Sequence, residues 1–333
     1  MRVGILTASS VRLLFHLYFA FLAFLALETN NSSFRVLILG HGEMGQAMEY
    51  LLHRRRALTV WERHPKPGIP PVDLESVTGQ QDFILFCLPA NPHFDLATRL
   101  RPHLRRESLC LSVAKGLDQH GRTAVQALND ALGSSAALGV LYGPMISEEI
   151  RAGHPAFAQA GVAHAEVFAR IRALFSGTSL YLEHTTDITG ISWAAVLKNV
   201  YAILFGVADE LKLGDNMRGY LAMAVMEELG QVVKNLGGAP AAAHRLAGLG
   251  DLITTATSSG SHHHDLGRRL ARGQAGELKG EGVHTLGMVR AHGLLDFHRY
   301  PLFDLIGRLF DNPATVIIQM EDFLGRLRRS ESA

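Results

Sequence analysis

The sequence is poor in cysteine. Its 333 residues include only two, Cys87 and Cys110, and each lies inside an apolar run. This low usage excludes a disulfide-stabilised secreted domain and fits a protein of a reducing compartment with both thiols in its core. Neither cysteine has a second Cys or His beside it at ligand spacing, so we expect no metal site there.

Net charge is nearly absent as well. The 32 Lys and Arg residues balance 31 Asp and Glu residues, for a formal charge of +1. This balance excludes the general basic surface of a nucleic-acid-binding protein, so an anionic ligand must be met by a local site. Hydrophobic residues make up 47% and charged residues 19%, proportions typical of globular proteins. The length allows two domains, and we find neither internal repeats nor a low-complexity linker.

The first 33 residues lack a complete targeting signal. The apolar run Leu13–Leu27 is interrupted only by His16, but its length of about 15 residues falls short of the roughly 20 that span a bilayer. Arg2 and Arg12 precede it, as in a signal anchor. We favour a mis-assigned start codon or an unstructured extension for residues 1–33, with a membrane-attached leader and a packed helix as alternatives. We expect a cytoplasmic protein without membrane association.

From Phe34 to residue 186, short apolar runs alternate with amphipathic stretches. The runs have the length of strands and cover residues 34–39, 57–61, 83–89, 108–114, 137–142, 155–161 and 179–184. The stretches between them have helical patterns and cover residues 45–54, 94–104, 123–132 and 165–175. Strands that alternate with helices and are apolar on both faces predict an α/β, Rossmann-like domain with a parallel, doubly wound sheet over residues 34–186.

The strand pattern stops after residue 186. Residues 188–213 have the pattern of one long apolar helix, and residues 216–236 that of another, ended by Gly237 at a C-cap position. More helices follow, so we predict an all-helical domain over residues 187–330. Two domains packed directly on each other leave a cleft between them, which is a usual place for ligands.

A glycine-rich turn follows the first strand. Gly40, Gly42 and Gly45 form a G-x-G-x-x-G pattern, with Glu43 and Met44 inside it, and the pattern opens a helix. In this context the glycines allow a tight turn, close approach of a pyrophosphate and close packing of helix on strand. The helix N-terminus then presents free N–H groups to the phosphates. The turn therefore predicts a dinucleotide cofactor, NAD or NADP.

The end of the second strand bears on which dinucleotide is bound. A carboxylate there bonds the ribose hydroxyls of NAD, whereas an arginine accepts the 2′-phosphate of NADP. Both types are present as neighbours, Glu62 and Arg63, followed by His64. Arg63 and His64 favour NADP modestly, while Glu62 leaves NAD open.

One lysine lies in the middle of an apolar helix. Lys198 follows Ala194-Ala195-Val196-Leu197, and a helix that is apolar all round is buried. A buried ammonium needs a partner or a cavity, and a lysine in a cleft can serve as an acid or base. Asp251, in the glycine-rich segment 248–252, is a candidate partner. Two structural alternatives remain: Lys198 extends outward to solvent, and Asp251 caps the following helix.

Taken in order, these segments resemble the NAD(P)-dependent glycerol-3-phosphate dehydrogenases of the bacterial type. The similarity extends over residues 34–325 and rests on the glycine turn and on the motifs VAKG (113–116), YGP (142–144), LKNV (197–200), LGDN (213–216), GLGDL (248–252) and GEGV (280–283). The resemblance implies an oxidoreductase that interconverts dihydroxyacetone phosphate and sn-glycerol 3-phosphate and feeds phospholipid synthesis. It also implies a homodimer.

The resemblance implies roles for particular residues. Lys198 would donate the proton to the ketone oxygen, and Asp251 would bond the substrate and hold Lys198 in place. The residues implied to bind the small phosphorylated substrate are Lys115, Gly143, Ser261, His262 and His263. Those implied to bind the cofactor are Gly40, Gly42, Glu43, Met44, Gly45, Arg63, His64, Lys115, Ser147, His262 and Glu281. We expect no resident metal, because adjacent residues such as His262, His263 and His264 rarely converge on one ion.

The sequence departs from the family pattern at four places. Ser261-His262-His263 replaces the Ser-Arg-Asn that grips the substrate phosphate, and a neutral histidine is a weaker anion ligand than arginine. Glu43-Met44 replaces Ser-Trp in the glycine turn, Met145 replaces a serine, and Ser192 replaces a glutamate. Two alternatives therefore stay open: a dehydrogenase of the same fold with another small keto or hydroxy substrate, and an NADP-binding protein without turnover.

Overall fold

All seven apolar runs form strands in the computed structural model, which describes residues 34–65, 71–258, 260–274 and 280–330. The strands are β1 (Arg35–Leu39), β2 (Ala57–Trp61), β3 (Phe83–Phe86), β4 (Leu109–Ser112), β5 (Ala137–Tyr142), β6 (Ala156–Gly161) and β7 (Leu180–Thr185). The central strands β1, β3 and β4 are almost completely buried, as expected for runs that are apolar on both faces.

The strands form one sheet in the order β2-β1-β3-β4-β5-β6-β7. All neighbouring pairs are parallel except β5 and β6, which are antiparallel, so the predicted parallel sheet is confirmed apart from this pair. The reason lies in the connection between them. After β5 the chain forms the short helix α6 (Ser147–Arg151), and Phe157 N donates to Pro144 O, so β6 begins beside the carboxyl end of β5. The chain never crosses the sheet, as a parallel pair would require.

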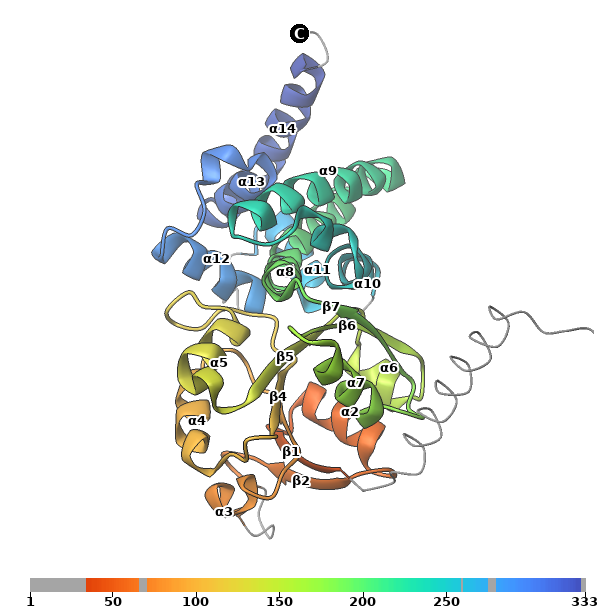
Figure 1. The fold of residues 1–333 in the computed structure, drawn as a ribbon. Coiled ribbons are helices and arrows are strands. Elements are labelled where there is room, and N and C mark those ends of the chain that lie inside the picture. The colour runs from red at the N-terminus through yellow and green to blue at the C-terminus, as the bar shows by residue number, and fades with distance from the viewer. Residues whose placement is uncertain (1–33, 66–70, 259, 275–279, 331–333) are drawn as a thin grey trace, which may run out of the picture. The chain divides into compact units, whose positions relative to one another are not determined.

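Helices cover both faces of the sheet. On one face lie α3 (Leu74–Thr78), α4 (His93–Leu100) and α5 (Ala124–Leu132), and on the other lie α2 (Glu43–Leu52) and α7 (Ala165–Leu174), as Figure 1 shows. Alternate side chains of β1 and β3 pack with leucines of α4 and α5 in one apolar cluster. Each large side chain buried there contributes about 1.5–3 kcal/mol. Cys110 is a free thiol in this cluster, and Cys87, directly after β3, is a second buried free thiol; burial raises the pKa of each to about 12.

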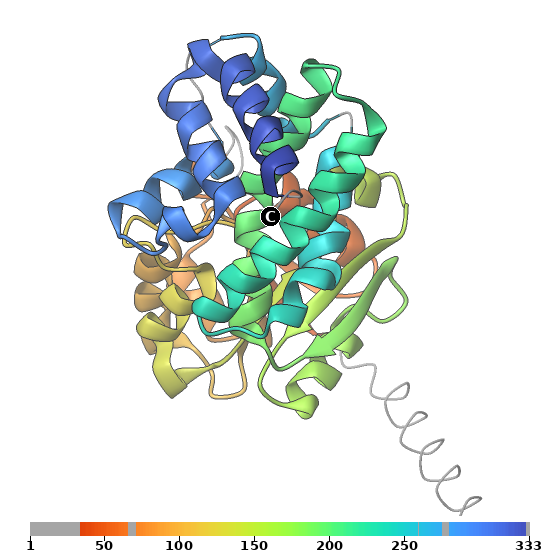
Figure 2. The ribbon, with the colours of Figure 1, turned by 90° about the horizontal axis from the view of Figure 1, so that it is seen from above.

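The second half of the chain is helical and surrounds one long helix. This is α8 (Ile188–Glu210), and α9 (Gly214–Asn235), α10 (Asp251–Thr257), α11 (His262–Ala271), α12 (Glu281–Ala291) and α13 (Pro301–Asp311) all pack on it. The last helix is α14 (Val316–Ser330). Figure 2 looks down on this half, where the blue-green and blue helices lie in front of the sheet. Gly237 follows α9 with φ +86°, which confirms the predicted C-cap.

The apolar residues of α8 are almost all buried in the protein core. The helix has a length and a mean hydropathy of 1.6 that would suit a membrane span, yet its most apolar window is entirely buried inside the protein. Helices α9 to α13 supply the apolar surroundings that a bilayer would otherwise supply. The described residues from Arg35 to Ser330 form one compact unit by their contacts. The alternatives for residues 1–33 lie outside the described residues and stay predictions.

Candidate active site

The glycine turn has the geometry of a phosphate cradle. Gly40 has φ +91°, and its N–H donates to Trp61 O at 2.8 Å. A Cβ on Gly45 would lie 2.0 Å from Gly40 O, so helix α2 packs on the turn only with glycine there. A Cβ on Gly42 would meet nothing within 4 Å, which leaves space for a ligand against the backbone. Since no side chain caps the α2 N-terminus, its N–H groups suit a pyrophosphate.

Two of the predicted cofactor residues meet beside this cradle. Glu43 Oε2 accepts hydrogen bonds from Ser147 Oγ at 2.7 Å and from Arg151 Nη2 at 2.9 Å. The Arg151 Nη1 group also donates to Gln46 Oε1 at 3.0 Å, which holds α6 against α2. Helix α6 thus holds the Glu43 carboxylate beside a cation, which reduces its repulsion of a pyrophosphate. Met44, the next residue of the turn, is half-buried.

The other predicted cofactor residues at this end lie just after β2. Arg63 and His64 are exposed to solvent. Glu62 is half-buried and turns toward the glycine turn, where its Oε1 lies 4.0 Å from His41 Nδ1. The structure therefore brings Glu62, rather than Arg63 or His64, against the cradle.

A lysine, an aspartate and a second lysine form the centre of the site. Lys198 and Asp251 are each only 3% exposed. Asp251 Oδ1 lies 3.1 Å from Lys198 Nζ, and Asp251 Oδ2 accepts a hydrogen bond from Lys115 Nζ at 2.6 Å. Lys115 Nζ also donates to Gly143 O at 3.0 Å. The interpretation of Lys198 as a lysine that reaches solvent is therefore wrong, because Asp251 pairs with it inside the protein.

Four segments of chain converge to build this centre. Lys115 follows β4 and Gly143 follows β5, and the carboxyl ends of neighbouring parallel strands meet at one edge of a sheet. Lys198 projects from α8, and Asp251 is the first residue of α10. The N-cap of α10 is Gly250, so the alternative that Asp251 caps the helix is wrong. A Cβ on Gly143 would lie 2.4 Å from Phe157 O, so only glycine fits where the chain passes Lys115.

The surroundings of Lys198 lower its pKa to about 8. Burial is the largest cause, and the ammonium of Lys115 acts in the same direction, while the carboxylates of Asp251 and Glu281 oppose it. Glu281, the first residue of α12, is exposed as a whole, but its carboxylate lies near Gly116, where desolvation raises its pKa against the pull of Lys115 and Lys198. A lysine whose pKa is close to neutral can give up and take back a proton during a reaction.

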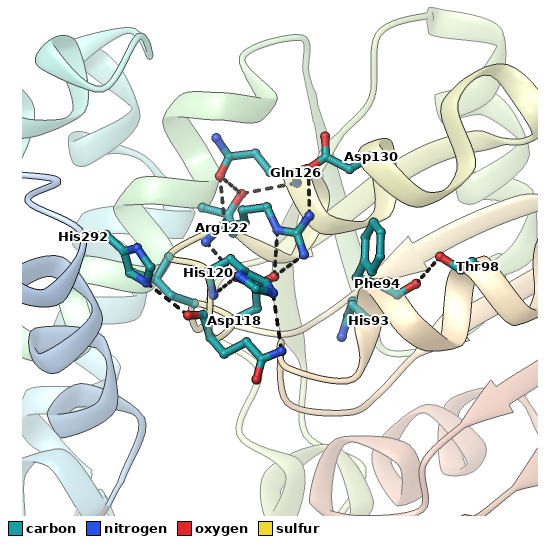
Figure 3. A network of polar contacts seen from close by, with 12 residues as sticks. His93, Phe94, Thr98, Asp118, His120, Arg122, Gln126, Asp130 and His292 are labelled. Atoms are coloured by element: carbon teal, nitrogen blue, oxygen red, sulfur yellow. Dashed lines mark hydrogen bonds and ion pairs between the residues drawn. The ribbon is translucent and has the colours of Figure 1, made fainter.

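The loop that carries Lys115 is held rigid by a buried aspartate. Asp118 accepts hydrogen bonds from the backbone N–H groups of His120 and Arg122 and from Arg122 Nε at 2.8 Å. Figure 3 shows Arg122 between Asp118 and Asp130. The Arg122 guanidinium lies over the Phe94 ring, 4.6 Å from its centre. This network fixes the loop on the Rossmann side of the site.

Two histidines tie the same loop to the helical half. His284 Nε2 lies 3.0 Å from Leu117 O, and His292 Nε2 lies 3.0 Å from Gln119 O, the latter contact visible in Figure 3. His284 belongs to α12, which begins with Glu281, and His292 follows that helix directly. The two contacts thus hold the loop that carries Lys115 against the helix that begins with Glu281.

The triple-histidine run spreads in three directions. Ser261 caps α11 by accepting from His264 N, and His264 Nε2 pairs with Asp209 Oδ2 at 2.7 Å, near the C-terminal end of α8 and away from Lys198 along the helix. His262 is exposed. His263 lies against Gly282, and its buried Nε2 has no hydrogen-bond partner among the described residues. Burial lowers the pKa of His263 to about 4, and the nearby Lys198 acts in the same direction, so its ring is neutral.

The comparisons with known proteins agree with this geometry. Residues 187–317 match the family model described as the C-terminus of NAD-dependent glycerol-3-phosphate dehydrogenase, and residues 70–167 match the model of its N-terminus. A glycerol-3-phosphate dehydrogenase (NAD(P)+) of Synechocystis sp. is 31% identical over 260 residues, which cover 75% of this chain and 80% of the relative. The chain belongs to the NAD(P)-dependent glycerol-3-phosphate dehydrogenase family.

Other relatives extend the match along the chain. The glycerol-3-phosphate dehydrogenase (NAD(P)+) of Agrobacterium fabrum is 27% identical over 319 residues, which cover 88% of this chain and 97% of the relative. Among solved structures, a glycerol-3-phosphate dehydrogenase from Coxiella burnetii has the same fold, with a TM-score of 0.75 and 23% identity over 86% of this chain and 98% of that one. The predicted resemblance is confirmed, and so are the Rossmann-like fold with its helical second half and the use of NAD or NADP.

The family match is uneven over the site. Lys115, Gly143, Lys198, Asp251 and Glu281 all lie within the matched residues, and so does the segment 261–263. The glycine turn, with Glu43-Met44 in place of the family's Ser-Trp, lies before residue 70, where the N-terminal match begins. The two family models therefore cover both lysines and Asp251 but not the glycine turn.

Sequence reasoning missed three residues of the site. Lys198 Nζ donates to Thr255 Oγ1, which in turn donates to Asp251 O at 2.7 Å, and Asn199 Nδ2 donates to Lys115 O at 3.5 Å. Thr255 lies four residues after Asp251, so a helical spacing pattern could have identified it. Arg151, which holds Glu43, gives no such signal, because its partner lies 108 residues away.

Proposed function

We propose that this chain reduces dihydroxyacetone phosphate to sn-glycerol 3-phosphate with NADH or NADPH, and that it catalyses the reverse oxidation. The observation that carries the proposal is the buried group of Lys198, Asp251 and Lys115 at the carboxyl edge of the sheet. The nicotinamide cofactor, when bound, supplies the hydride to the ketone carbon. The protein must then supply a proton and meet the negative charge that grows on the ketone oxygen.

Lys198 is the group that fits this proton transfer. Its ammonium gives a proton to the oxygen as the hydride arrives, which converts ketone to alcohol and leaves a neutral amine. In the reverse direction the neutral amine takes the hydroxyl proton. A pKa of about 8 makes both protonation states accessible near neutral pH. Asp251 keeps Lys198 in place and limits the fall of its pKa, because the carboxylate favours the ammonium form.

We assign the remaining roles by the position of each residue. Lys115 and Gly143 contact the substrate, and the N-terminal part of α11, with Ser261, His262 and His263, meets its phosphate. The cofactor is held by the glycine turn, by Glu43, Met44 and Ser147 beside it, and by Glu281 near Lys115. In this proposal residues 34–186 form the cofactor domain and residues 187–330 the substrate domain. The protein acts in the cytoplasm as a homodimer, with no membrane or nucleic-acid partner.

A second substrate class is favoured by one observation. His263 is neutral and its buried Nε2 has no partner among the described residues, so the segment 261–263 offers less positive charge than an arginine clamp would. A small keto or hydroxy compound with a neutral polar end would suit this uncharged nitrogen. A protein that only binds the dinucleotide is disfavoured, because it has no need of a buried proton donor.

The test is cofactor oxidation by the full chain with dihydroxyacetone phosphate, followed with NADH and NADPH in parallel, and with dihydroxyacetone as the matched ketone without phosphate. Rapid oxidation with the phosphorylated ketone alone, and sn-glycerol 3-phosphate as the product, supports the proposal. Oxidation that does not depend on the phosphate supports the second class. Cofactor binding without oxidation of either ketone would contradict both.

A further inference from the structure

The end of strand β2 is fixed against the glycine turn. Gly40 N donates to Trp61 O at 2.8 Å, which joins the last residue of β2 to the first residue of the turn. Glu62 comes immediately after Trp61 and therefore lies beside the cradle. In a fold of this type, this position faces the ribose that bears the adenine of a bound dinucleotide.

The Glu62 side chain points toward the turn. Its Oε1 lies 4.0 Å from His41 Nδ1, and the side chain is only 26% exposed. The same His41 ring contacts a second carboxylate, since its Nε2 lies 2.6 Å from Glu49 Oε2. One histidine thus lies between two carboxylates at this corner of the cradle, and Arg63 and His64 lie beyond it in solvent.

This arrangement distinguishes the two dinucleotides. A carboxylate is an acceptor, so it bonds the two ribose hydroxyls of NAD. In NADP one of these hydroxyls carries a phosphate, which brings more negative charge against Glu62 and Glu49 and offers the carboxylate one donor fewer. We propose that Glu62 gives this chain a preference for NAD(H) over NADP(H), the opposite of what Arg63 and His64 suggest in the sequence alone. The inference rests on the proposed function only in that the chain binds a nicotinamide dinucleotide.

The experiment measures binding without turnover. Fluorescence titration of the full chain with NADH and with NADPH, in the absence of any ketone, gives two dissociation constants. We expect NADH to bind at least about tenfold more tightly, the effect of losing one hydrogen bond to a charged group. The variant Glu62→Gln keeps the size of the side chain and removes its charge. It should tighten NADPH binding and bring the two constants within about threefold of each other.

Two further variants separate Glu62 from its neighbours. Glu49→Gln removes the other carboxylate at His41 and should change the ratio less than Glu62→Gln does, because Glu49 lies on the far side of the ring. Arg63→Ala should leave the ratio of the wild type nearly unchanged. A wild type that prefers NADPH would overturn the inference, as would a ratio that Arg63→Ala alters and Glu62→Gln does not.

The proposed function and this preference fail in different ways. If neither dinucleotide binds, the proposed function is wrong and the preference falls with it. If NADH binds more tightly but no ketone is reduced, the preference stands and the proposed activity fails. If both dinucleotides bind equally and dihydroxyacetone phosphate is reduced, the activity stands and the role of Glu62 is wrong. Thermal unfolding of each variant verifies that it is folded.

Discussion

Two buried carboxylates lie against helix α8 about one turn apart, and they have different surroundings. Asp251 meets Lys198, and Glu228 of α9 meets Tyr201, three residues further along the helix. Each carboxylate is less than 9% exposed. The difference lies in their partners, because Asp251 lies between two ammonium groups and Glu228 has only neutral donors.

Glu228 is fully bonded within the helical half. Its Oε1 accepts from Tyr201 Oη at 2.9 Å and from Phe303 N at 2.8 Å, and its Oε2 accepts from Leu302 N at 2.8 Å. Leu302 and Phe303 belong to the first turn of α13, whose N–H groups have no partner inside that helix. Burial raises the pKa of Glu228, while these bonds oppose the rise. The carboxylate thus joins α8, α9 and α13, and this role needs no ligand.

Asp251 is also fully bonded, but a polar atom without a partner lies near it. Lys115 and Lys198 share the one carboxylate, Lys198 has a pKa lowered to about 8, and the nearby His263 Nε2 has no partner among the described residues. Native proteins rarely bury such groups unless something else completes the bonding. The comparison teaches that a buried charge with all its partners in the fold indicates architecture. A buried charge shared by two ammonium groups and close to an unpaired polar atom indicates a ligand.

The largest effect that sharpens this comparison is expected at Lys198. Replacing it by Met should lower turnover with dihydroxyacetone phosphate at least about 100-fold, the contribution of a general acid. The free energy of unfolding should stay the same or rise, because a buried ammonium is costly and Asp251 keeps Lys115 as its partner. Steady-state kinetics and thermal unfolding measure the two effects. Lys234→Met, on the exposed side of α9, is the control and should change neither. Near-normal turnover of Lys198→Met would show that the Lys198–Asp251 pair, like Glu228, has only a structural role.

The reverse pattern is expected at Glu228. Replacing it by Ala leaves three buried donors without an acceptor and should lower the free energy of unfolding by about 2–4 kcal/mol. Turnover per folded molecule should stay within about twofold of the wild type, because no atom of Glu228 bonds a residue of the site. Chemical denaturation measures the loss, and Glu227→Ala, at an exposed neighbouring position, provides the matched control. A Glu228→Ala variant with normal stability and lost activity would show that Glu228 serves the reaction and not the fold.

A smaller effect is expected at His263. If its free Nε2 meets the substrate phosphate, His263→Ala should raise the KM for dihydroxyacetone phosphate about tenfold and change kcat little, the loss of one hydrogen bond. Because the pKa of His263 is lowered to about 4, the ring stays neutral and its contribution to KM should not change between pH 6 and pH 8. Kinetics at both pH values test this. An unchanged KM in His263→Ala would show that other groups hold the phosphate.

Most of the fold follows from local patterns. Strands buried on both faces are apolar throughout, and α8 is apolar all round, so their positions are readable from the residues. The antiparallel pair of β5 and β6 is not readable, since the pattern of a strand carries no direction. Helix α6 has only five residues, too few for a helical pattern to show.

The site divides in the same way. Lys198 and Asp251 could be predicted because a charge in an apolar helix and an acid between glycines are local anomalies. The bond from Arg151 to Glu43 depends on the path of the chain after β5, so it needed the structure. Glu228 looks like any glutamate of an amphipathic helix, and its partners on α13 follow more than 70 residues later. The orientation of Glu62 toward His41 likewise depends on how β2 ends beside the glycine turn.

The pH dependence of the two reaction directions tests the central role of Lys198 most directly. Reduction of dihydroxyacetone phosphate needs the ammonium form, so its kcat/KM should fall as the pH rises through about 8, the pKa to which burial lowers Lys198. Oxidation of sn-glycerol 3-phosphate needs the neutral amine, so its kcat/KM should rise over the same range. In the wild type the Asp251 carboxylate raises the pKa of Lys198, because it stabilises the ammonium form. In Asp251→Asn this effect is lost, so both inflections should move to lower pH. Profiles that change in the same sense in both directions, or that Asp251→Asn leaves in place, would contradict the account.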